Sequence, residues 1–201
     1  MRYYVKTKRA FTLIELLTVI AIIGVLVALL FPAIKSALGK AEAAKAQQGV
    51  SGLATAYKAY YTEYGKWPAT TTDPSGIMTT TNWMVALLRG EDKSATEGII
   101  TYNGNPRHIR FLEMKTADLA IDPVNNLTNY VDPWKTAYQV LFDTSYSDTN
   151  RNPFVPPPIA TVHEGALIWS KGPDGQDSSY ANTGSPVGDG VGVNKDNIKS
   201  W

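Results

Sequence analysis

The chain has 201 residues, with 19 Lys and Arg against 18 Asp and Glu and a formal net charge of +1. This balance argues against a nucleic-acid-binding protein, which needs a clear basic excess, so no nucleic-acid partner is expected. The absence of cysteine excludes disulfide scaffolds, thiolate zinc sites and cysteine nucleophiles. With two histidines and no hydrolase or phosphate-loop motif, the composition favours a protein that is not an enzyme.

The N-terminal segment is a basic leader followed by a long apolar run. Residues 1–10 contain four cationic side chains and no acid: Arg2, Lys6, Lys8 and Arg9. Residues 11–31 (FTLIELLTVIAIIGVLVALLF) are apolar except for Glu15 and two threonines. As a helix with a rise of about 1.5 Å per residue, this run is about 30 Å long, which matches the hydrocarbon core of a bilayer. The preceding cations predict a single crossing with the N-terminus in the cytoplasm and the rest of the chain exported.

A cleavable secretory signal or a plain anchor is the alternative interpretation of this segment. The apolar region of a signal is about 7–15 residues long and ends in a small-x-small cleavage site. The run at 11–31 is longer, and Ser36-Ala37 is the nearest candidate site. Glu15 also fits this alternative poorly, because an ionised side chain in a membrane helix costs about 2.5–3.5 kcal/mol and normally has a partner.

Residues 8–17 (KRAFTLIELL) resemble the processing site of type IV pilins and of type II secretion pseudopilins. The resemblance implies that a prepilin peptidase cuts between Ala10 and Phe11 and that the new N-terminal Phe11 is then N-methylated. The family usually has Gly before the cut, where this chain has Ala10.

Glu15 has a physical role in this scheme, because cleavage creates an ammonium group at Phe11, one helical turn away. In a stacked filament, Glu15 of one subunit is expected to face the Phe11 ammonium of its neighbour. At about 4 Å and an effective dielectric constant near 20, the pair gains about 4 kcal/mol before desolvation costs. In the alternative, Glu15 extends to the membrane surface and pairs with nothing.

Beyond Pro32 the sequence predicts that the helix continues with a kink. Apolar side chains recur mostly three or four residues apart, as on an amphipathic helix: Ile34, Ala37, Leu38, Ala41, Ala44, Val50, Leu53, Ala54, Tyr57, Tyr60, Tyr61 and Tyr64. We expect one helix from Phe11 to Tyr64, with a transmembrane and assembly half at 11–31 and an amphipathic half at 32–65. The tyrosines also suggest carbohydrate stacking, but their helical spacing favours a place in the core.

Residues 66–201 are predicted to form an α+β head. The Thr-, Pro- and Gly-rich segment 66–81 is expected to be a loop. Thr81-Asn82 then starts a short helix that ends near Gly90. Short strands are expected at 99–102, 107–114, 137–142 and 166–170, because β-branched and aromatic residues lie there between turn signals. The predicted fold is therefore one long helix packed on a small antiparallel sheet, with an irregular C-terminal loop.

Three C-terminal segments resemble major pseudopilins of type II secretion. Residues 132–138 (DPWKTAY) are similar to an Asp-Pro-Trp-Gly-x-x-Tyr segment, with Lys135 in place of Gly. Residues 169–175 (WSKGPDG) resemble a Ser-x-Gly-x-Asp-Gly segment, and residues 196–201 (DNIKSW) resemble an Asp-Ile-x-x-Trp ending. Ordinary type IV pilins often close this region with a disulfide, which this chain cannot form, so the tail favours a pseudopilin.

Major pseudopilins hold calcium in this loop, and the resemblance implies a site here. Calcium takes six to eight oxygen ligands from carboxylates and backbone carbonyls. Four aspartates lie in the Gly- and Ser-rich tail, with Asp174 and Asp196 on the matched segments and Asp177 and Asp189 between them. A rival site has the oxygen spacing of an EF-hand loop but has Pro153 in place of its Gly: Asp143, Asp148, Asn150 and Asn152.

The resemblance implies a structural function as leading hypothesis: a pseudopilin in an inner-membrane-based periplasmic filament that supports type II secretion. Its expected partners are copies of itself in a helical filament, the prepilin peptidase, minor pseudopilins, the secretion platform and, before assembly, membrane lipid. A second hypothesis is a surface type IV pilin for adhesion, motility or DNA uptake. A third is a membrane-anchored enzyme or binding protein that uses His163-Glu164 or the aspartates, although no convergent acid, base and nucleophile are apparent.

Overall fold

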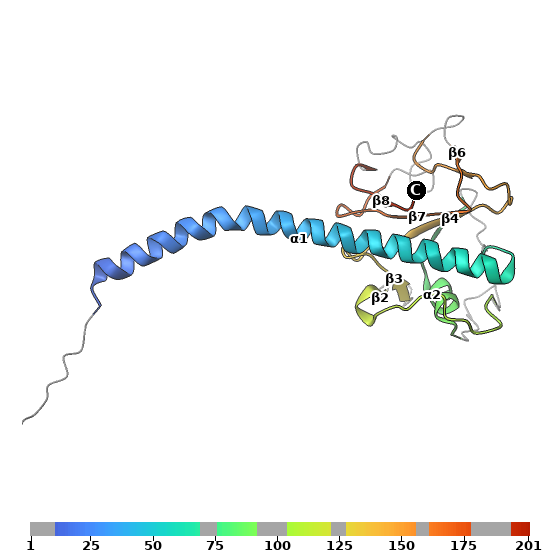
Figure 1. Cartoon of the computed structure of the whole chain (residues 1–201), viewed down its shortest axis with the longest axis horizontal. Helices are drawn as coiled ribbons and strands as arrows, with labels where there is room; N and C mark the ends of the chain where they lie inside the picture. Colours follow the sequence, from blue (N-terminus) through green and yellow to red (C-terminus); the bar gives the residue numbers. More distant parts are fainter. Residues whose placement is uncertain (1–10, 69–75, 92–103, 122–127, 156–160, 178–193) are drawn as a thin grey trace, which may run out of the picture. The chain divides into compact units, whose positions relative to one another are not determined.

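The computed structural model describes residues 11–68, 76–91, 104–121, 128–155, 161–177 and 194–201. The chain divides into two compact units, Met1–Ala41 and Glu42–Trp201. One long helix, α1 (Leu13–Tyr64), runs through the end of the first unit into the second (Figure 1). This confirms the predicted long helix. It ends at Gly65, whose N–H donates to the Tyr61 carbonyl at 2.8 Å and whose φ is 66°.

Residues 11–41 of the first unit expose their side chains throughout. Their apolar side chains are not buried in a core: Leu13 is 81% and Phe31 is 69% exposed. Pro32 lies inside α1, which continues beyond it. By length and composition, α1 is able to cross a membrane. The division of the helix into halves at residues 31 and 32 stays a prediction.

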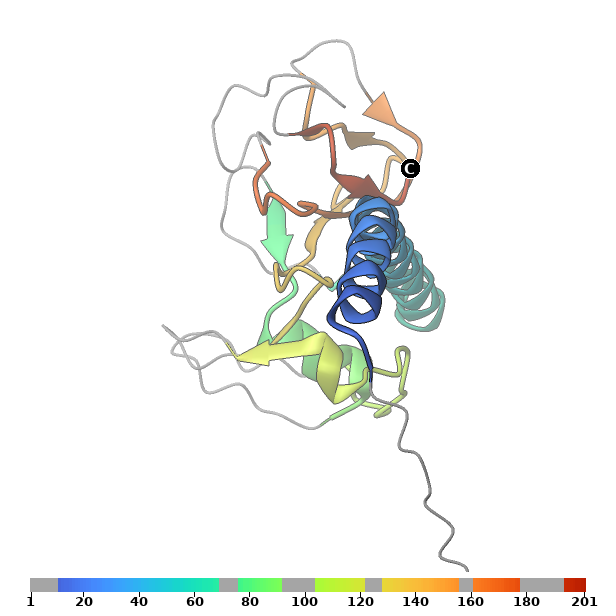
Figure 2. The ribbon, with the colours of Figure 1, turned by 90° about the vertical axis from the view of Figure 1, so that its left-hand side faces the viewer.

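The second unit is built around a four-stranded antiparallel sheet. Its strand order is β1 (Ile77–Thr79), β4 (Gln139–Phe142), β7 (Ala166–Ser170) and β8 (Ile198–Lys199). In its centre Val140 pairs with Ile168. Two short antiparallel pairs accompany it: β2 (Leu119–Ile121) with β3 (Thr128–Tyr130), and β5 (Asn150–Arg151) with β6 (Thr161–Val162). Figures 1 and 2 show β7 and β8 on one side of residues 42–64 of α1, with α2 (Asn82–Arg89) and β2–β3 on the other.

Side chains are buried on both faces of the sheet, because neighbouring residues of a strand point in opposite directions. One face packs against the buried stripe of α1 and against α2, and includes Val50, Leu53, Tyr57, Tyr60, Val140, Phe142 and Ile168. The other face forms a smaller cluster of Ile77, Leu141, Phe154, Leu167 and Trp169. All five residues of β7 are therefore buried. The predicted α+β fold of a long helix on an antiparallel sheet is confirmed.

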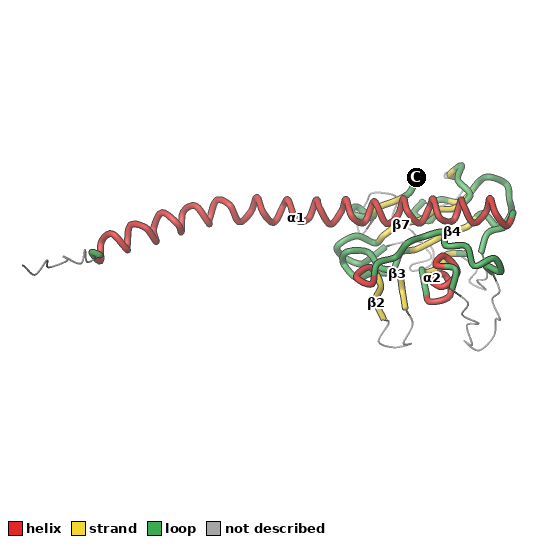
Figure 3. The backbone as a smooth tube through the Cα atoms, turned by 60° about the horizontal axis from the view of Figure 1, so that its bottom comes forward, coloured by secondary structure: helices red, strands yellow, loops and turns green. Residues whose placement is uncertain are grey.

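The short helix and two of the strands lie where the sequence placed them. Helix α2 ends at Gly90, which takes the left-handed conformation with φ 68°. Its predicted N-cap, Thr81, has the extended conformation of a cap but makes no side-chain capping bond. The strands expected at 137–142 and 166–170 are β4 and β7. Figure 3 shows both strands beside the C-terminal half of α1.

The strand predicted at 107–114 is wrong. The N–H groups of Phe111 and Leu112 donate to the Leu88 carbonyl at 2.8 and 3.1 Å, so this segment lies against the end of α2 without a strand partner. Asn105 fixes its start, because its amide donates to the Leu87 and Ile109 carbonyls. The segment 66–81, expected to be loop, contains β1 at its end. The strand expected at 99–102 lies outside the described residues.

Gly49 and Gly52 both lie inside α1, but only Gly49 occupies a crowded position. A Cβ on Gly49 would overlap the hydroxyl oxygen of buried Tyr138 and lie 2.7 Å from its Cζ atom. The nearest atom to a Cβ on Gly52 is Leu112 Cδ1, at an ordinary 3.7 Å.

We predict that Gly49→Ala lowers the free energy of unfolding by about 1–3 kcal/mol, because the Tyr138 ring must move. The matched variant Gly52→Ala should leave it unchanged or raise it by up to about 1 kcal/mol through helix propensity. Urea denaturation of the detergent-solubilised chain, followed by circular dichroism, measures both. Equal effects of the two substitutions would contradict the packing described here.

Candidate functional site

The N-terminal end of α1 is closed by a reciprocal pair of capping bonds. The backbone N–H and the hydroxyl of Thr12 donate to Glu15 Oε2 at 2.8 and 2.6 Å, and the Glu15 N–H donates to Thr12 Oγ1 at 3.3 Å. This is a capping box, in which Thr and Glu three residues apart satisfy helix N–H groups that have no partner in the helix. The Thr-x-x-Glu spacing is the sequence signal for this cap.

The capping box gives Glu15 a role within a single chain. Its Oε2 atom is occupied by Thr12, while its backbone carbonyl accepts a bond from the Thr18 hydroxyl at 3.0 Å. Phe11 lies at the start of the described chain with 78% of its surface exposed. Ala10, on the other side of the predicted cleavage site, lies outside the described residues. The pairing of Glu15 with Phe11 of a neighbour stays a prediction.

The buried carboxylate of Asp132 organises the first of the matched C-terminal segments. Its Oδ1 accepts from the N–H groups of Trp134 and Thr136 at 3.0 and 2.9 Å, and its Oδ2 accepts from the Ser170 hydroxyl at 2.6 Å. Burial raises the pKa of Asp132, although these hydrogen bonds and Lys135 oppose the shift. Asp132 thereby fixes its own turn to the end of β7.

Ser170 and Gly172 connect the second matched segment to the third. The Gly172 N–H donates to Ser170 Oγ at 3.0 Å. Gly172 has a φ of 72°, and a Cβ there would lie 2.5 Å from the Asp196 carbonyl oxygen, so only glycine allows this approach. The Asp174 N–H donates to Asp196 Oδ2 at 3.4 Å. The three segments at 132–138, 169–175 and 196–201 therefore meet in one place.

Lys135 occupies the position of the Gly in the Asp-Pro-Trp-Gly-x-x-Tyr segment of pseudopilins, and the backbone conformation there explains why glycine is suitable. Lys135 has a φ of 70°, which is the left-handed conformation that glycine adopts without strain. Its N–H still closes the turn to the Asp132 carbonyl at 3.0 Å, and its ammonium donates to the Ala117 carbonyl at 3.1 Å. The turn is thus kept despite the substitution, because side-chain and backbone bonds offset the strain.

The four aspartates predicted to bind calcium are placed differently from one another. Asp174 and Asp196 are adjacent, with the Asp196 backbone carbonyl close by. Asp177 is buried and its Oδ2 accepts from Trp169 Nε1 at 3.0 Å, so that atom serves the core. Asp189 lies outside the described residues. Among the described residues no group of three or more Asp, Glu, His or Cys side chains forms a metal site.

The rival loop at 143–152 uses its oxygen atoms to bind its own chain. Asp143 Oδ1 accepts from the N–H and the hydroxyl of Ser145 at 3.0 and 2.6 Å. Burial alone would raise the pKa of Asp143. The bonds from Ser145 and from the N–H groups of Asp148 and Thr149 lower this pKa by more than burial raises it, so the net shift is downward. Asn152 Oδ1 accepts from the Phe154 N–H at 3.0 Å. These bonds engage Asp143 and Asn152 within the loop, and the rival calcium site stays a prediction.

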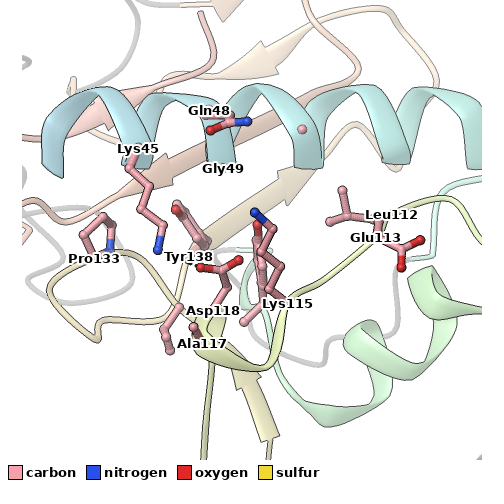
Figure 4. A pocket seen from close by; sticks show the side chains of 13 residues that line it. Lys45, Gln48, Gly49, Leu112, Glu113, Lys115, Ala117, Asp118, Pro133 and Tyr138 are labelled. Carbon is pink, nitrogen blue, oxygen red and sulfur yellow. Dashed lines mark ion pairs between the residues drawn. The ribbon is translucent and has the colours of Figure 1, made fainter. Parts of the chain in front are cut away.

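A cavity of about 270 Å³ lies between α1 and the segments at 112–118 and 130–138. Figure 4 shows the Lys45 ammonium directed toward the Asp118 carboxylate at its edge, and the two groups are 2.8 Å apart. Tyr138 and Gly49 line its inner part, while Lys115 and Glu113 add opposite charges. This mixed lining indicates no preference for an anionic or a cationic ligand.

His163-Glu164, which the enzyme hypothesis used, lies beside α1. The Glu164 carboxylate pairs with Lys58 at 2.8 Å, and its carbonyl accepts from the Asn150 amide at 2.6 Å. These contacts give Glu164 a structural role in fixing the β5–β6 region to the helix.

Comparison with known proteins identifies relatives of the chain. Residues 5–31 match the prokaryotic N-terminal methylation motif. The fimbrial protein EcpC of Eikenella corrodens is 34% identical over 96 residues, which cover 48% of this chain and 62% of that protein. A type IV major pilin protein PilE of Neisseria gonorrhoeae is 35% identical over 102 residues, 51% of this chain and 59% of that pilin. These matches support the type IV pilin-like superfamily.

The similarity of this pilin-like chain to its relatives is partial. It spans less than two thirds of the length of these curated relatives, and only 44% of a fimbrial protein of Neisseria meningitidis that is 36% identical over 75 residues. No solved structure matches the chain significantly. The methylation motif includes Phe11 and Glu15, which agrees with the resemblance seen in the sequence.

Proposed function

We propose that the chain is a structural subunit of a helical filament assembled from the inner membrane, and that it is a pseudopilin of type II secretion. The observation that carries the second part is the junction of three C-terminal segments through Asp132, Ser170, Gly172 and Asp196. All three segments resemble major pseudopilins, and hydrogen bonds close this region without a disulfide.

In this proposal, prepilin peptidase cuts between Ala10 and Phe11, and residues 11–31 hold the processed subunit in the membrane as a single-pass anchor. The N-terminus is cytoplasmic and the head at 66–201 is periplasmic. The exposed apolar side chains of the anchor contact lipid before assembly and the helices of other copies afterwards. Minor pseudopilins and the secretion platform are the further partners.

A second candidate is a surface type IV pilin. The names of the relatives, which are fimbrial proteins and type IV major pilins, favour it. Both functions share the processing step and the anchor. They differ in whether the filament stays in the periplasm and supports secretion, or extends from the cell surface for adhesion, motility or DNA uptake.

Deletion of the gene distinguishes these two functions. We expect the deletion strain to lose secreted proteins from the medium and to keep its surface fibres, twitching and DNA uptake. The complemented strain should contain a mature protein that begins at N-methylated Phe11, as read by intact mass. Loss of surface fibres with normal secretion would favour the pilin, and a mature start beyond Ala37 would contradict both candidates.

Glu15 has two separable roles in this scheme, capping within a chain and charge pairing between chains. Gln is an accepted partner in a capping box, so Glu15→Gln keeps the cap and removes only the charge. Glu15→Ala removes both.

We predict that Glu15→Gln inserts into the membrane as well as the unmutated chain, or better, because it removes a costly charge from the apolar run. It should nevertheless assemble at least about tenfold less filament, because the neighbouring Phe11 ammonium loses a pair worth about 4 kcal/mol before desolvation. Thr12→Val, which keeps the charge and removes the hydroxyl, is the matched control for the cap. Expression of each variant is induced, filaments are sheared from the cells, and the yield is measured in the sheared fraction. Normal yield from Glu15→Gln would refute charge pairing.

Calcium binding in the tail is a separate proposal. Carboxylate and carbonyl oxygens are the donors that calcium prefers, and the bond from the Asp174 N–H to Asp196 Oδ2 brings these two residues together. We propose that Asp189 completes the set, while Asp177 contributes less because it holds Trp169. When bound, the ion supplies positive charge that joins the second and third matched segments.

We predict that the full chain in detergent melts several degrees lower in chelator than in millimolar calcium. A ligand that binds only the folded state adds about 2.7 kcal/mol at a hundred times its Kd. Asp174→Ala should abolish the difference, and Asp148→Ala, in the rival loop, should keep it. If Asp148→Ala alone removed the calcium dependence, the site would move to the rival loop, and no dependence in the unmutated chain would remove calcium.

A further inference from the structure

An aromatic stack runs from the core of the head to its surface. The Tyr57 ring meets Phe142 edge-on at 4.9 Å, and Phe142 stacks on Trp67 with centroids 5.4 Å apart. Trp67 stacks in turn on Tyr61, at 4.5 Å and an interplanar angle of 24°. The Tyr61 ring is therefore held by Trp67, which is itself anchored in the core through Phe142, and it has little freedom to lose on binding.

The outer end of this stack is enlarged by a second tyrosine. Tyr146 lies 6.3 Å from Tyr61, with the two rings inclined by 31°. Tyr146 is 54% exposed and Tyr61 36%, and the only other exposed large hydrophobic residue in the described part of the head is Ile121. We call these two side chains the Tyr61–Tyr146 platform.

The backbone beneath Tyr146 is strained and is held in place. Tyr146 and Asp148 have φ values of 55° and 56°, which cost about 1–3 kcal/mol each for residues other than glycine. Asp143 offsets this cost by accepting bonds from Ser145 and from the N–H groups of Asp148 and Thr149. A chain of hydroxyl contacts from Ser145 through Ser147 to Thr149 ties the loop further, with oxygens 3.0 and 2.7 Å apart. The loop thus holds the half-exposed Tyr146 ring beside Tyr61.

The surroundings of the platform are polar, and the charged side chain that precedes it on α1 is neutralised by a partner. Lys58, one helical turn before Tyr61, is paired with Glu164 at 2.8 Å. The exposed hydroxyls of Ser145 and Ser147 lie on the other side, in the Tyr146 loop. A protein-binding hot spot usually sets its aromatic residues in an apolar patch, which the described residues here lack. Flat aromatic rings beside hydroxyl and amine groups instead suit a sugar ring, whose C–H face stacks on the ring and whose hydroxyls form hydrogen bonds.

We propose that the Tyr61–Tyr146 platform binds a neutral saccharide chain. The site is independent of the filament function, because it uses no residue of the anchor or of the C-terminal junction. It also gives a role to Tyr61, the most exposed tyrosine of the helical stripe, since Tyr57 and Tyr60 are fully buried and Tyr64 is partly buried.

The full chain, purified in lauryldimethylamine oxide to avoid sugar-containing detergents, is titrated with cellohexaose and with chitohexaose. Tryptophan fluorescence reports binding because Trp67 lies directly against Tyr61, and calorimetry provides a second measurement. We expect saturable binding of at least one of the two saccharides. Tyr61→Ala and Tyr146→Gly should each raise its Kd by about tenfold or more. Glycine accepts the positive φ of residue 146, so this variant removes the ring without straining the fold.

Two variants act as controls. Tyr61→Phe keeps the ring and should bind within about threefold of the unmutated chain, because stacking is retained. Ile121→Ala removes an equally exposed apolar side chain elsewhere and should have no effect. The proposal is overturned if neither saccharide binds saturably, or if Tyr146→Gly binds as tightly as the unmutated chain. Loss of filament bundling in Tyr146→Gly without saccharide binding would assign the platform to protein contacts instead.

Discussion

The apolar side chains of residues 11–41 are exposed, and a chain of this kind depends on their removal from water. Burying a Leu, Ile or Phe side chain gains about 1.5–3 kcal/mol, so the exposed set represents on the order of tens of kcal/mol, more than the stability of a typical domain. In the proposed function, lipid provides this burial before assembly. The helices of a filament are no more apolar than lipid. Burial alone therefore does not drive a helix from the membrane into a filament. In that proposal, polar contacts at Glu15 are therefore the ones expected to direct a subunit from lipid into the filament.

In the head, both faces of the sheet carry apolar side chains, and each face has to be covered. The stripe of α1 covers one face, and on the other face Phe154 and Trp201 pack against Trp169. Hydrogen bonds hold the C-terminal segments beside this cluster. Asp132 holds Ser170, Ser170 holds Gly172, and Asp196 lies against both Gly172 and Asp174. The Ser200 N–H and hydroxyl then bond to the backbone of Ile168, which fixes the C-terminal end to β7. A buried polar junction of this kind specifies one arrangement, since each unpaired group would cost about 1–3 kcal/mol.

Strong local patterns made part of this structure predictable. The stripe from Val50 to Tyr60 and the continuous apolar run of β7 indicated their elements, and the three motifs indicated that Asp174 and Asp196 belong together. Residues 107–114 misled the prediction, because the alternation around Arg110 resembles a strand while Asn105 and Leu88 hold the segment as a loop. The two-residue strands β5, β6 and β8 are too short to carry a period. Their pairing depends on contacts between distant residues, which a local pattern does not contain.

Three turns of the head share one construction, which links the strained residues to buried polar ones. Asn105, Asp132 and Asp143 are all buried, and the carbonyl of each accepts the N–H of the residue three positions later, at 3.0, 3.0 and 3.4 Å. Those later residues are His108, Lys135 and Tyr146, and all three have positive φ.

In each turn the Asx side chain accepts a further backbone N–H two or four residues ahead, which offsets the strain at the third position. Glycine adopts a positive φ without strain and needs no supporting hydrogen bonds. This accounts for the Gly that pseudopilins have at the position of Lys135. A residue with a side chain is retained at such a position only where the bonds of the turn can support it. Lys135 uses its side chain to reach Ala117, and Tyr146 uses its own to extend an aromatic surface. At Lys135 and Tyr146 the strained residue thus has a side chain that contacts something beyond its own turn.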